Sequence, residues 1–389
     1  MDAVGIGIVG AGKIFEQHAI ACNSLAGRAR LLGIADINEA QLQKASAQYG
    51  IPFLAADYRS LLDRKDIDVI TVCTPPVLHE GIVVDALEAG KFVICEKPLA
   101  HTLESADRII AAAKKHPGQL STVYQFRYLP EVQRALWLRE HGRLGRLLFG
   151  RFHRFAKFEA PARPAKDGKT AKPAKKRSAW WGEWQTAGGG VVMTQLIHEI
   201  DLMQHIFGRA TEVSASIETL REAIESEDTC SATIRFESGA IVSCQGTMTA
   251  QRSSHGFDVI GDRVSVHSPW ALESLDGEWR DESLHAVLQM YPLPETPAAK
   301  QSGTSAHTPY LAEVVAAIQE ARPLPIGPAE ARASLEICTA IYASALNGRP
   351  VKLPIDHTNN YYAGLTTAIY DGRQRQSRKA PAVAEQVPA

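Results

Sequence analysis

The sequence predicts an α/β domain with a parallel sheet, followed by a domain with an antiparallel sheet. Two observations predict the first domain: short apolar segments alternate with amphipathic helical patterns over about the first 120 residues, and glycines follow the first apolar segment. Short, wholly apolar strands separated by helices are typical of a parallel sheet buried on both faces. The second domain is predicted by later segments in which apolar and polar residues alternate, which is the pattern of antiparallel strands.

The elements of the first domain follow from these patterns in order. Strands are expected at residues 4–9, 31–35, 69–73, 92–95 and 120–125, and helices at 13–25, 39–49, 77–89 and 103–115. Gly90 supports the end of the third helix, because glycine commonly follows the last residue of a helix. Ligands of such a sheet bind beyond the carboxyl ends of its strands. The residues that directly follow each strand are therefore the candidate site.

A chain of 389 residues is long enough for two domains. We predict a first domain at 1–125 and a second at 126–371, with a disordered tail at 372–389. In the second domain, helices are expected at 129–141, 191–207, 309–321 and 329–346, and strands at 146–158, 211–219, 230–236 and 240–249. Residues 159–178 are rich in Ala, Pro and Lys, a composition that does not bury enough surface to order itself. This insertion is either a solvated, flexible loop or a basic lid over an anionic group.

The overall composition excludes several classes of protein. Lys and Arg number 42 against 43 Asp and Glu, so the net charge predicts no binding to nucleic acid or to an anionic membrane. No apolar run approaches the roughly 20 residues that span a bilayer, and the N-terminus lacks the basic leader of a secretory signal. Six scattered cysteines without a CxxC pair argue against a disulfide framework or a zinc site and fit a cytoplasmic protein.

The turn after the first strand predicts a dinucleotide site. Gly7, Gly10 and Gly12 fit a GxxGxG pattern, in which glycines let backbone N–H groups approach a pyrophosphate at a helix N-terminus. Asp36 ends the second strand, where a carboxylate accepts hydrogen bonds from the adenosine ribose and repels a 2′-phosphate. We therefore expect NAD rather than NADP, bound by the backbone of Gly10 to Ile14 (Gly10, Ala11, Gly12, Lys13 and Ile14) and by Asp36. The alternatives are a tight strand-to-helix connection and an aspartate that caps the next helix.

Several motifs together resemble one known family. They are the glycine turn, the Cys73-Thr-Pro75 turn with His79, the Glu96-Lys97-Pro98 turn, and two later segments that begin at Trp181 and at Gly188 (WGEW and GGGVVMTQLIHEID). Over roughly residues 4 to 350 the chain resembles the Gfo/Idh/MocA oxidoreductases. The resemblance implies a Rossmann domain followed by an α+β domain with a large, open, mostly antiparallel sheet. It also implies NAD(P)-dependent oxidation or reduction of sugars, inositols or sugar nucleotides.

The same resemblance implies the roles of the site residues. Lys97 and His198 are the expected catalytic residues, since a lysine of lowered pKa can polarise the reacting oxygen and a histidine can exchange its proton. The cofactor side is expected to include Thr74, Pro75, His79, Glu96, Lys97 and Gln125, and the substrate side Arg127, Trp181, Thr194, Gln195 and Asp201. Arg127 either anchors an anionic group or clamps the domain interface, and His79 is either a cofactor contact or a surface residue.

A polar face on the predicted helix at 191–207 supports the assignment of His198. Thr194, His198 and Asp201 are spaced at i, i+4 and i+7, so they share one face of an α-helix. Many relatives have aspartate at the position of Thr194 and glycine at that of Leu196, and this departure leaves Lys97 and His198 to carry the proton chemistry. No metal site is expected, because His198 and its acidic neighbours do not converge and no second histidine cluster accompanies them.

Three functions remain open at this stage. The first is an NAD-dependent dehydrogenase or reductase of a sugar, cyclitol or sugar nucleotide. The second is an enzyme that keeps NAD tightly bound for internal redox or redox-assisted elimination or hydrolysis, and the third is a non-catalytic sensor of NAD and sugar. A homo-oligomer, either a dimer or a tetramer, is expected through the sheet of the second domain, because one face of that sheet needs to be covered.

Overall fold

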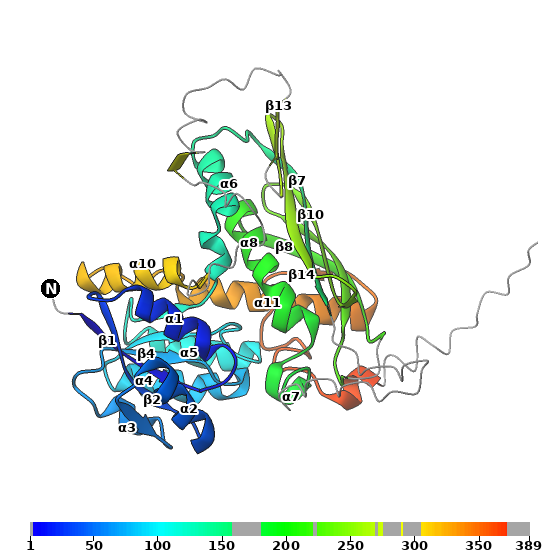
Figure 1. Cartoon of the computed structure of the whole chain (residues 1–389). Helices are drawn as coiled ribbons and strands as arrows, with labels where there is room; N and C mark the ends of the chain where they lie inside the picture. The colour runs from blue at the N-terminus through cyan, green and yellow to red at the C-terminus, as the bar shows by residue number, and fades with distance from the viewer. Residues whose placement is uncertain are drawn as a thin grey trace, which may run out of the picture.

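The structure is a computed structural model that describes residues 3–157, 180–220, 224–268, 271–274, 289–290 and 305–371. The predicted insertion at 159–178 and the predicted tail at 372–389 lie outside the described residues. Two sheets organise the molecule, one from each half of the chain (Figure 1). No helix in the described part is long and apolar enough to cross a membrane.

The first sheet has the strand order β3-β2-β1-β4-β5-β6, and all its pairs are parallel. Its strands are β1 (Val4–Val9), β2 (Ala29–Ala35), β3 (Phe53–Ala55), β4 (Val69–Val72), β5 (Phe92–Cys95) and β6 (Leu120–Thr122). Its helices are α1 (Phe15–Ser24), α2 (Glu39–Tyr49), α3 (Arg59–Leu62), α4 (His79–Glu88) and α5 (Leu103–Ala113), with a 3₁₀ turn η1 (Pro76–Leu78). Every residue of β1 and β4 is buried, as the apolar pattern predicts for a sheet covered on both faces. The parallel Rossmann sheet is confirmed, and only β3 and α3 were not expected.

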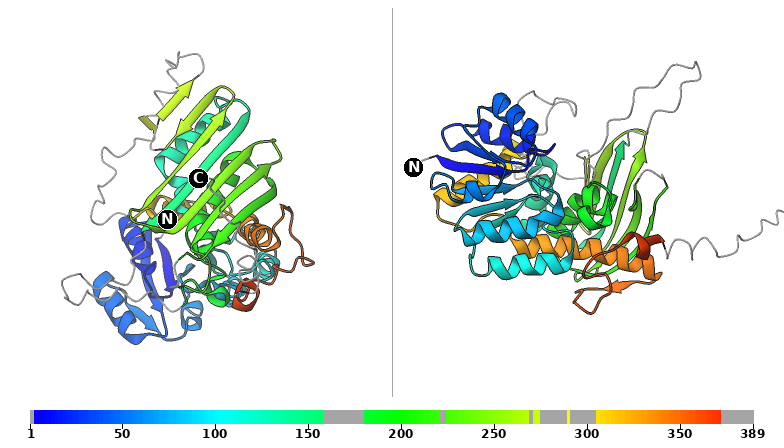
Figure 2. Two further views of the ribbon diagram at one scale, coloured as in Figure 1. Left: turned by 90° about the vertical axis from the view of Figure 1, so that its right-hand side faces the viewer. Right: turned by 90° about the horizontal axis from the view of Figure 1, so that it is seen from below.

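The second sheet has the order β13-β12-β11-β7-β10-β9-β8-β14 among the described residues. Its strands are β7 (Leu147–Lys157), β8 (Ala210–Glu218), β9 (Thr229–Phe236), β10 (Ile241–Ala250), β11 (Ser254–Gly261), β12 (Val264–His267), β13 (Ala271–Ser274) and β14 (Val351–Lys352). The pair β7–β10 is parallel and the other pairs are antiparallel, so the mostly antiparallel sheet is confirmed. Its outer face carries none of the described helices (Figure 2, left).

The helices of the second half of the chain pack on the second sheet, on one another or on the first half. They are α6 (Pro130–Glu140), α7 (Trp184–Ala187), α8 (Ile197–Phe207), α10 (Thr308–Gln319) and α11 (Pro328–Asn347), with the short turns η2 (Gln125–Tyr128) and η3 (Val192–Leu196). Helix α11 packs against α5, α8 and β8, and α10 returns to pack on α1 (Figure 2, right). Both C-terminal helices therefore touch the first half of the chain.

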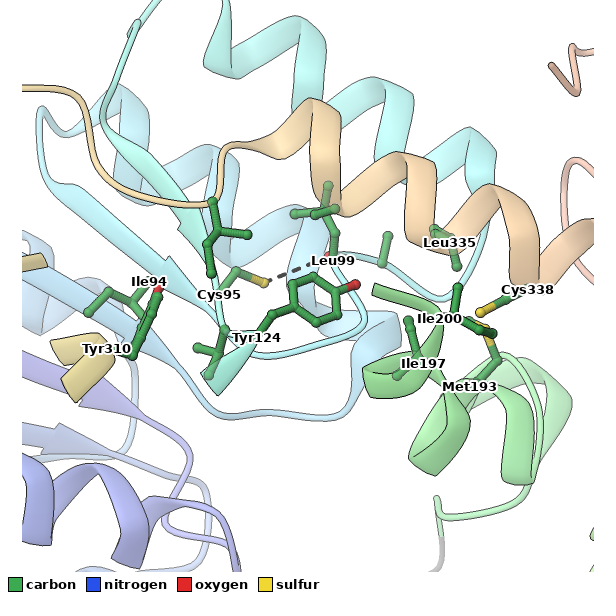
Figure 3. Close-up of a cluster of buried hydrophobic side chains, with 14 of the residues drawn as sticks. Ile94, Cys95, Leu99, Tyr124, Met193, Ile197, Ile200, Tyr310, Leu335 and Cys338 are labelled. Atoms are coloured by element: carbon green, nitrogen blue, oxygen red, sulfur yellow. Dashed lines mark hydrogen bonds between the residues drawn. The ribbon is translucent and has the colours of Figure 1, made fainter. Parts of the chain in front are cut away.

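One apolar core crosses the boundary between the two halves. Tyr124, which follows β6, is buried in a cluster with Ile197 and Ile200 of α8 and with Leu335 and Cys338 of α11 (Figure 3). The same cluster continues to Ile94, Leu99, Met193 and Tyr310. Because interiors are close-packed, this shared core fixes where α8 stands relative to the strand ends of the first sheet.

The segment that begins α8 differs from the single helix expected at 191–207. Residues Val192–Leu196 form a π turn before the regular helix starts at Ile197. The buried carboxylate of Glu227 accepts hydrogen bonds from the backbone N–H groups of Gly190 (3.0 Å) and Val192 (2.9 Å) and from the hydroxyl of Tyr342 (3.0 Å). Glu227 thus satisfies backbone donors at the helix start that otherwise lack partners.

The close approach at Gly190 gives a first prediction. A Cβ at Gly190 would overlap the carbonyl oxygen of Glu227, whereas a Cβ at Gly81 in α4 would meet nothing within 4 Å. Gly190→Ala should lower Tm by several degrees, because forced overpacking costs about 1–3 kcal/mol or more. Gly81→Ala should leave Tm unchanged or raise it, because alanine favours a helix by roughly 0.5–1 kcal/mol. Calorimetry of both variants checks this, and equal melting temperatures would contradict it.

Candidate active site

The turn between β1 and α1 is shaped for a dinucleotide. Gly10 has φ +102°, and a Cβ there would lie 2.7 Å from the carbonyl oxygen of Cys73, so only glycine fits. A Cβ on Gly12 would project into open space, where the backbone can approach a pyrophosphate. Asp36 Oδ2 accepts the N–H of Ala11 at 2.6 Å, which ties the end of β2 to this turn. Gly12 is followed by the exposed Lys13 and the half-buried Ile14.

The glycine pattern in the structure differs from the one read in the sequence. Gly7 lies within β1 and packs against Ile67, so it takes no part in the turn. The turn is formed by Gly10 and Gly12, and three residues later Phe15 is buried in the first turn of α1. Asp36 also accepts the N–H of Asn38 at 2.8 Å, and the side chain of Asn38 caps α2. Asp36 therefore organises both neighbouring connections.

The turn after β4 offers a second polar contact to a cofactor. The hydroxyl of Thr74 is buried and has no hydrogen-bond partner among the described residues, while Pro75 is half-buried. His79 is fully buried, and its two ring nitrogens lie 2.9 Å from the carbonyl oxygens of Thr74 and Pro98. His79 thus bridges the turns after β4 and β5 and is not a surface residue. An unpaired buried hydroxyl beside the glycine turn fits a bound dinucleotide.

The turn after β5 carries Glu96, buried between two imidazoles. Glu96 Oε1 lies 2.7 Å from His18 Nε2 and 3.4 Å from His307 Nε2. Burial alone would raise the pKa of Glu96, but hydrogen bonding to these imidazoles holds the pKa well below its usual range. Glu96 Oε2 also accepts the backbone N–H of Lys97 at 3.2 Å. Glu96 therefore fixes the backbone from which Lys97 projects.

Lys97 reaches across to the start of α8. Its Nζ donates a hydrogen bond to the carbonyl oxygen of Thr194 at 2.8 Å, and the Lys97–Pro98 peptide is cis. Burial lowers the pKa of Lys97, and Arg154 lowers it further, while the carboxylates of Glu96 and Glu199 oppose them. The hydroxyl of Thr194 donates to the carbonyl oxygen of Gly190 at 2.7 Å. The side-chain hydroxyl of Thr194 is thus bonded within its own segment, and its backbone carbonyl accepts the hydrogen bond from Lys97.

His198 is buried with one ring nitrogen unused. Its Nδ1 has no hydrogen-bond partner among the described residues, and its ring stacks on Phe126 with centroids 4.4 Å apart. Burial, then the charge of Lys97, then that of Arg154 lower the pKa of His198 well below its usual value. A neutral imidazole can accept a proton. Nearby Gln125 is buried, and its side-chain carbonyl oxygen has no hydrogen-bond partner in the described part of the chain; Gln195 is half-buried.

Arg127 and Asp201 form a buried clamp. Arg127 donates from Nε and Nη2 to the two oxygens of Asp201, each at 2.7 Å, and from Nη1 to Glu330 of α11 at 2.6 Å. Ser334 donates to Asp201 at 3.3 Å. These contacts join the segment after β6 to α8 and α11, and this geometry favours the interface clamp over the anion anchor for Arg127. Trp181 is half-buried and packs against the apolar core.

The comparisons with known proteins agree with this arrangement. Residues 4–124 match the oxidoreductase family with an NAD-binding Rossmann fold, and residues 132–267 match the GFO/IDH/MocA C-terminal domain. The chain belongs to the GFO/IDH/MocA oxidoreductases. Like its relatives, it is an NAD-dependent oxidoreductase that acts on CH–OH groups.

Three relatives illustrate the family. Levoglucosan dehydrogenase from Pseudarthrobacter phenanthrenivorans is 26% identical over 303 residues, covering 68% of this chain and 73% of that protein. Myo-inositol 2-dehydrogenase from Thermotoga maritima is 25% identical over 259 residues, covering 65% and 70%. The crystal structure of the WlbA dehydrogenase from Bordetella pertussis, in complex with NADH and UDP-GlcNAcA, is 26% identical, covers 91% of this chain and 99% of its own, and has a TM-score of 0.73.

In this family member, several site groups had no assignment from the sequence. Glu199 is buried beside His198, and its Oε1 lies 3.5 Å from Nη1 of Arg154 on β7. Phe126, Glu199 and His255 all line one small pocket. Glu199 could have been suspected from its place next to His198, but nothing in the sequence of a strand indicates that Arg154 faces the site. Only the packing of sheet against helix brings these groups together.

The burial of Glu199 gives a second prediction. Burial raises the pKa of Glu199 to about 8, although Arg154 opposes the shift, whereas an unfolded glutamate has a pKa of about 4.3. The stability from a protonated Glu199 is therefore complete below about pH 4.3 and is lost as the pH rises through about 8, at up to ~1.4 kcal/mol per pH unit. Relative to the wild type, Glu199→Gln should gain stability from pH 5 to pH 9.

Melting temperatures of both proteins at pH 5 and pH 9 measure this difference. Glu140→Gln, on the exposed surface of α6, is the matched control and should shift Tm by the same small amount at both pH values. A Tm difference between Glu199→Gln and the wild type that does not change with pH would show that Glu199 is ionised throughout.

Proposed function

We propose that this protein transfers a hydride between NAD and a secondary hydroxyl or ketone of a sugar, cyclitol or sugar nucleotide. The observation that carries the proposal is the meeting of two groups beyond the carboxyl ends of the first sheet. One is the ammonium of Lys97, held at the carbonyl of Thr194, and the other is the unpaired Nδ1 of His198. A base and a cationic donor beside a dinucleotide platform are what oxidation of an alcohol needs.

The residues divide the chemistry between them. Gly10, Gly12 and Asp36 would hold the dinucleotide, and Thr74 and Gln125 offer it the buried polar atoms of the neighbouring turns. Bound nicotinamide supplies the hydride acceptor. His198 is neutral because burial lowers its pKa, so it accepts the proton that leaves the substrate hydroxyl. The Lys97 ammonium donates a hydrogen bond to the same oxygen and stabilises its developing charge.

The sugar class rests on the relatives. The names of the three relatives described above include levoglucosan, myo-inositol and UDP-GlcNAcA. All carry a secondary hydroxyl within a ring. We propose a ring alcohol of this class as the substrate, with Trp181, Thr194 and Gln195 on its side of the site.

The organisation of the chain supports three further proposals. Residues 1–125 form the nucleotide domain and 126–371 the substrate domain, with α10 and α11 crossing between them.

The uncovered outer face of the second sheet (Figure 2, left) is the surface through which two or four copies associate, and sedimentation at monomeric mass would refute this. All six cysteines are buried free thiols, which agrees with a cytoplasmic location.

Activity on a substrate panel tests the proposed function. Protein incubated with NAD⁺ and a set of sugars, inositols and UDP-sugars should produce reduced nicotinamide absorbance with at least one member. Lys97→Ala should lower kcat by at least about 100-fold and leave NAD binding nearly intact, while Lys114→Ala, on the exposed end of α5, should match the wild type. Full activity of Lys97→Ala would remove Lys97 from the mechanism, and silence across the panel would contradict the dehydrogenase.

Cofactor choice is tested at Asp36. Asp36→Ala removes the carboxylate that would repel a 2′-phosphate and also the acceptor for the N–H of Ala11. The variant should bind NAD more weakly and lose most of its preference over NADP, measured as the ratio of the two dissociation constants. An unchanged ratio would mean that Asp36 serves only the turn.

A further inference from the structure

Arg154 places a positive charge on the inner face of the second sheet, beside the proposed catalytic pair. It lies on β7 directly opposite His255 of β11, and the buried Phe152 shares its face of the strand. Its guanidinium stands over the ring of Phe126, 4.9 Å from the centroid. The ring of Phe126 also stacks on His198 at 4.4 Å and on His255 at 5.8 Å. One aromatic ring therefore connects Arg154 to the proposed base.

The charge of Arg154 is poorly compensated. Among the described residues it forms one ion pair, a contact of 3.5 Å to Glu199, whose second oxygen is buried without a hydrogen-bond partner there. Burial raises the pKa of Glu199 to about 8, so this carboxyl is largely protonated at neutral pH. Arg127, by contrast, meets both oxygens of Asp201 at 2.7 Å. Arg154 thus keeps the capacity for a two-pronged hydrogen bond to an anion.

Arg154 also acts electrostatically on the proposed catalytic pair. Arg154 lowers the pKa of both Lys97 and His198, in each case after the larger effect of burial. A positive charge that lowers the pKa of two neighbouring groups must lie close to both of them, in a region with little water to screen it. An incoming anion would relieve this repulsion, whereas a neutral sugar would leave it in place.

We propose that Arg154 anchors a carboxylate of the substrate, so that the enzyme acts on an acidic sugar such as a hexuronate rather than on its neutral counterpart. The inference rests on the proposed dehydrogenase function and names the class of its substrate. The carboxyl of Glu199 contacts Arg154 through one oxygen, so a substrate carboxylate would bind Arg154 next to Glu199. Protonated Glu199 can donate its O–H to that carboxylate, and His255 lies beside it on the neighbouring strand.

Equilibrium binding tests the anchor without relying on turnover. The NADH complex is titrated by calorimetry with three pairs: D-glucuronate and D-glucuronamide, D-galacturonate and D-galacturonamide, and UDP-glucuronate and UDP-glucose. At least one acid should bind about 30-fold or more tightly than its neutral partner, because a buried charge pair left without one partner costs at least about 2 kcal/mol. D-glucose 6-phosphate is added as an anion of different shape.

Variants assign the preference to Arg154. Arg154→Gln should remove most of the preference for the acid and leave the affinity for the neutral partner within about threefold, whereas Arg154→Lys should keep part of the preference because it keeps the charge. Arg209→Gln, from the exposed pair with Glu237 beyond the other end of α8, makes the same change of charge away from the site and should behave as the wild type. Circular dichroism of each variant shows whether it is folded.

The outcomes separate this inference from the proposed function. Equal affinity for the acid and the neutral member of every pair, or an equal loss for both in Arg154→Gln, overturns the carboxylate anchor. Tighter binding of the sugar phosphate than of every acid overturns it too. Oxidation of neutral sugars with NAD⁺ in the same preparation would leave the dehydrogenase standing while the anchor fails. Selective binding of an acid without any oxidation would retain the anchor and reject the dehydrogenase.

Discussion

The arrangement of the site depends on the buried ion pair between Arg127 and Asp201. Arg127 follows the last strand of the first sheet, and Asp201 lies on the helix that carries His198, so this contact sets the distance between the two halves of the site. A buried pair of this kind adds little net stability, but removing one partner leaves an uncompensated charge that costs about 3–5 kcal/mol. Its contact with Glu330 extends the constraint to α11. The main effect of this pair is therefore to fix the position of α8 relative to the segment after β6, rather than to stabilise the fold.

A second constraint acts at the start of the same helix. Glu227 holds the backbone of Gly190 and Val192, and the π turn that follows delivers the carbonyl of Thr194 to Lys97. The segment that carries His198 is therefore fixed at its start by the carboxylate of Glu227 and further along by the guanidinium of Arg127, through Asp201. The pair Lys97 and His198 is held by this network and by the shared apolar core (Figure 3), and neither side chain depends on a flexible loop for its place.

The sequence alone predicted much of the fold, because apolar runs and glycine turns are local signals. The bounds of β5 and of α2 agree with the pattern to the residue, while the three-residue strand β3 is too short to show a period. In the site, Lys97 and His198 followed from motifs. Arg154 and His307 could not be predicted, since each reaches the site through packing between segments far apart in the chain. The same applies to the partners of Arg127 and His79, whose bonds are set by tertiary contacts.

Burial shifts the pKa values of the groups in this site in opposite directions. It lowers the pKa of Lys97 and His198, which are cationic when protonated, and raises that of Glu199, which is anionic when ionised. Each group is thus driven toward its neutral form, because charge is costly in a water-poor region. An arginine cannot respond in this way, since a guanidinium is not deprotonated in proteins. Arg154 therefore keeps its charge in this region, and the single contact with Glu199 leaves that charge open to an anion that enters.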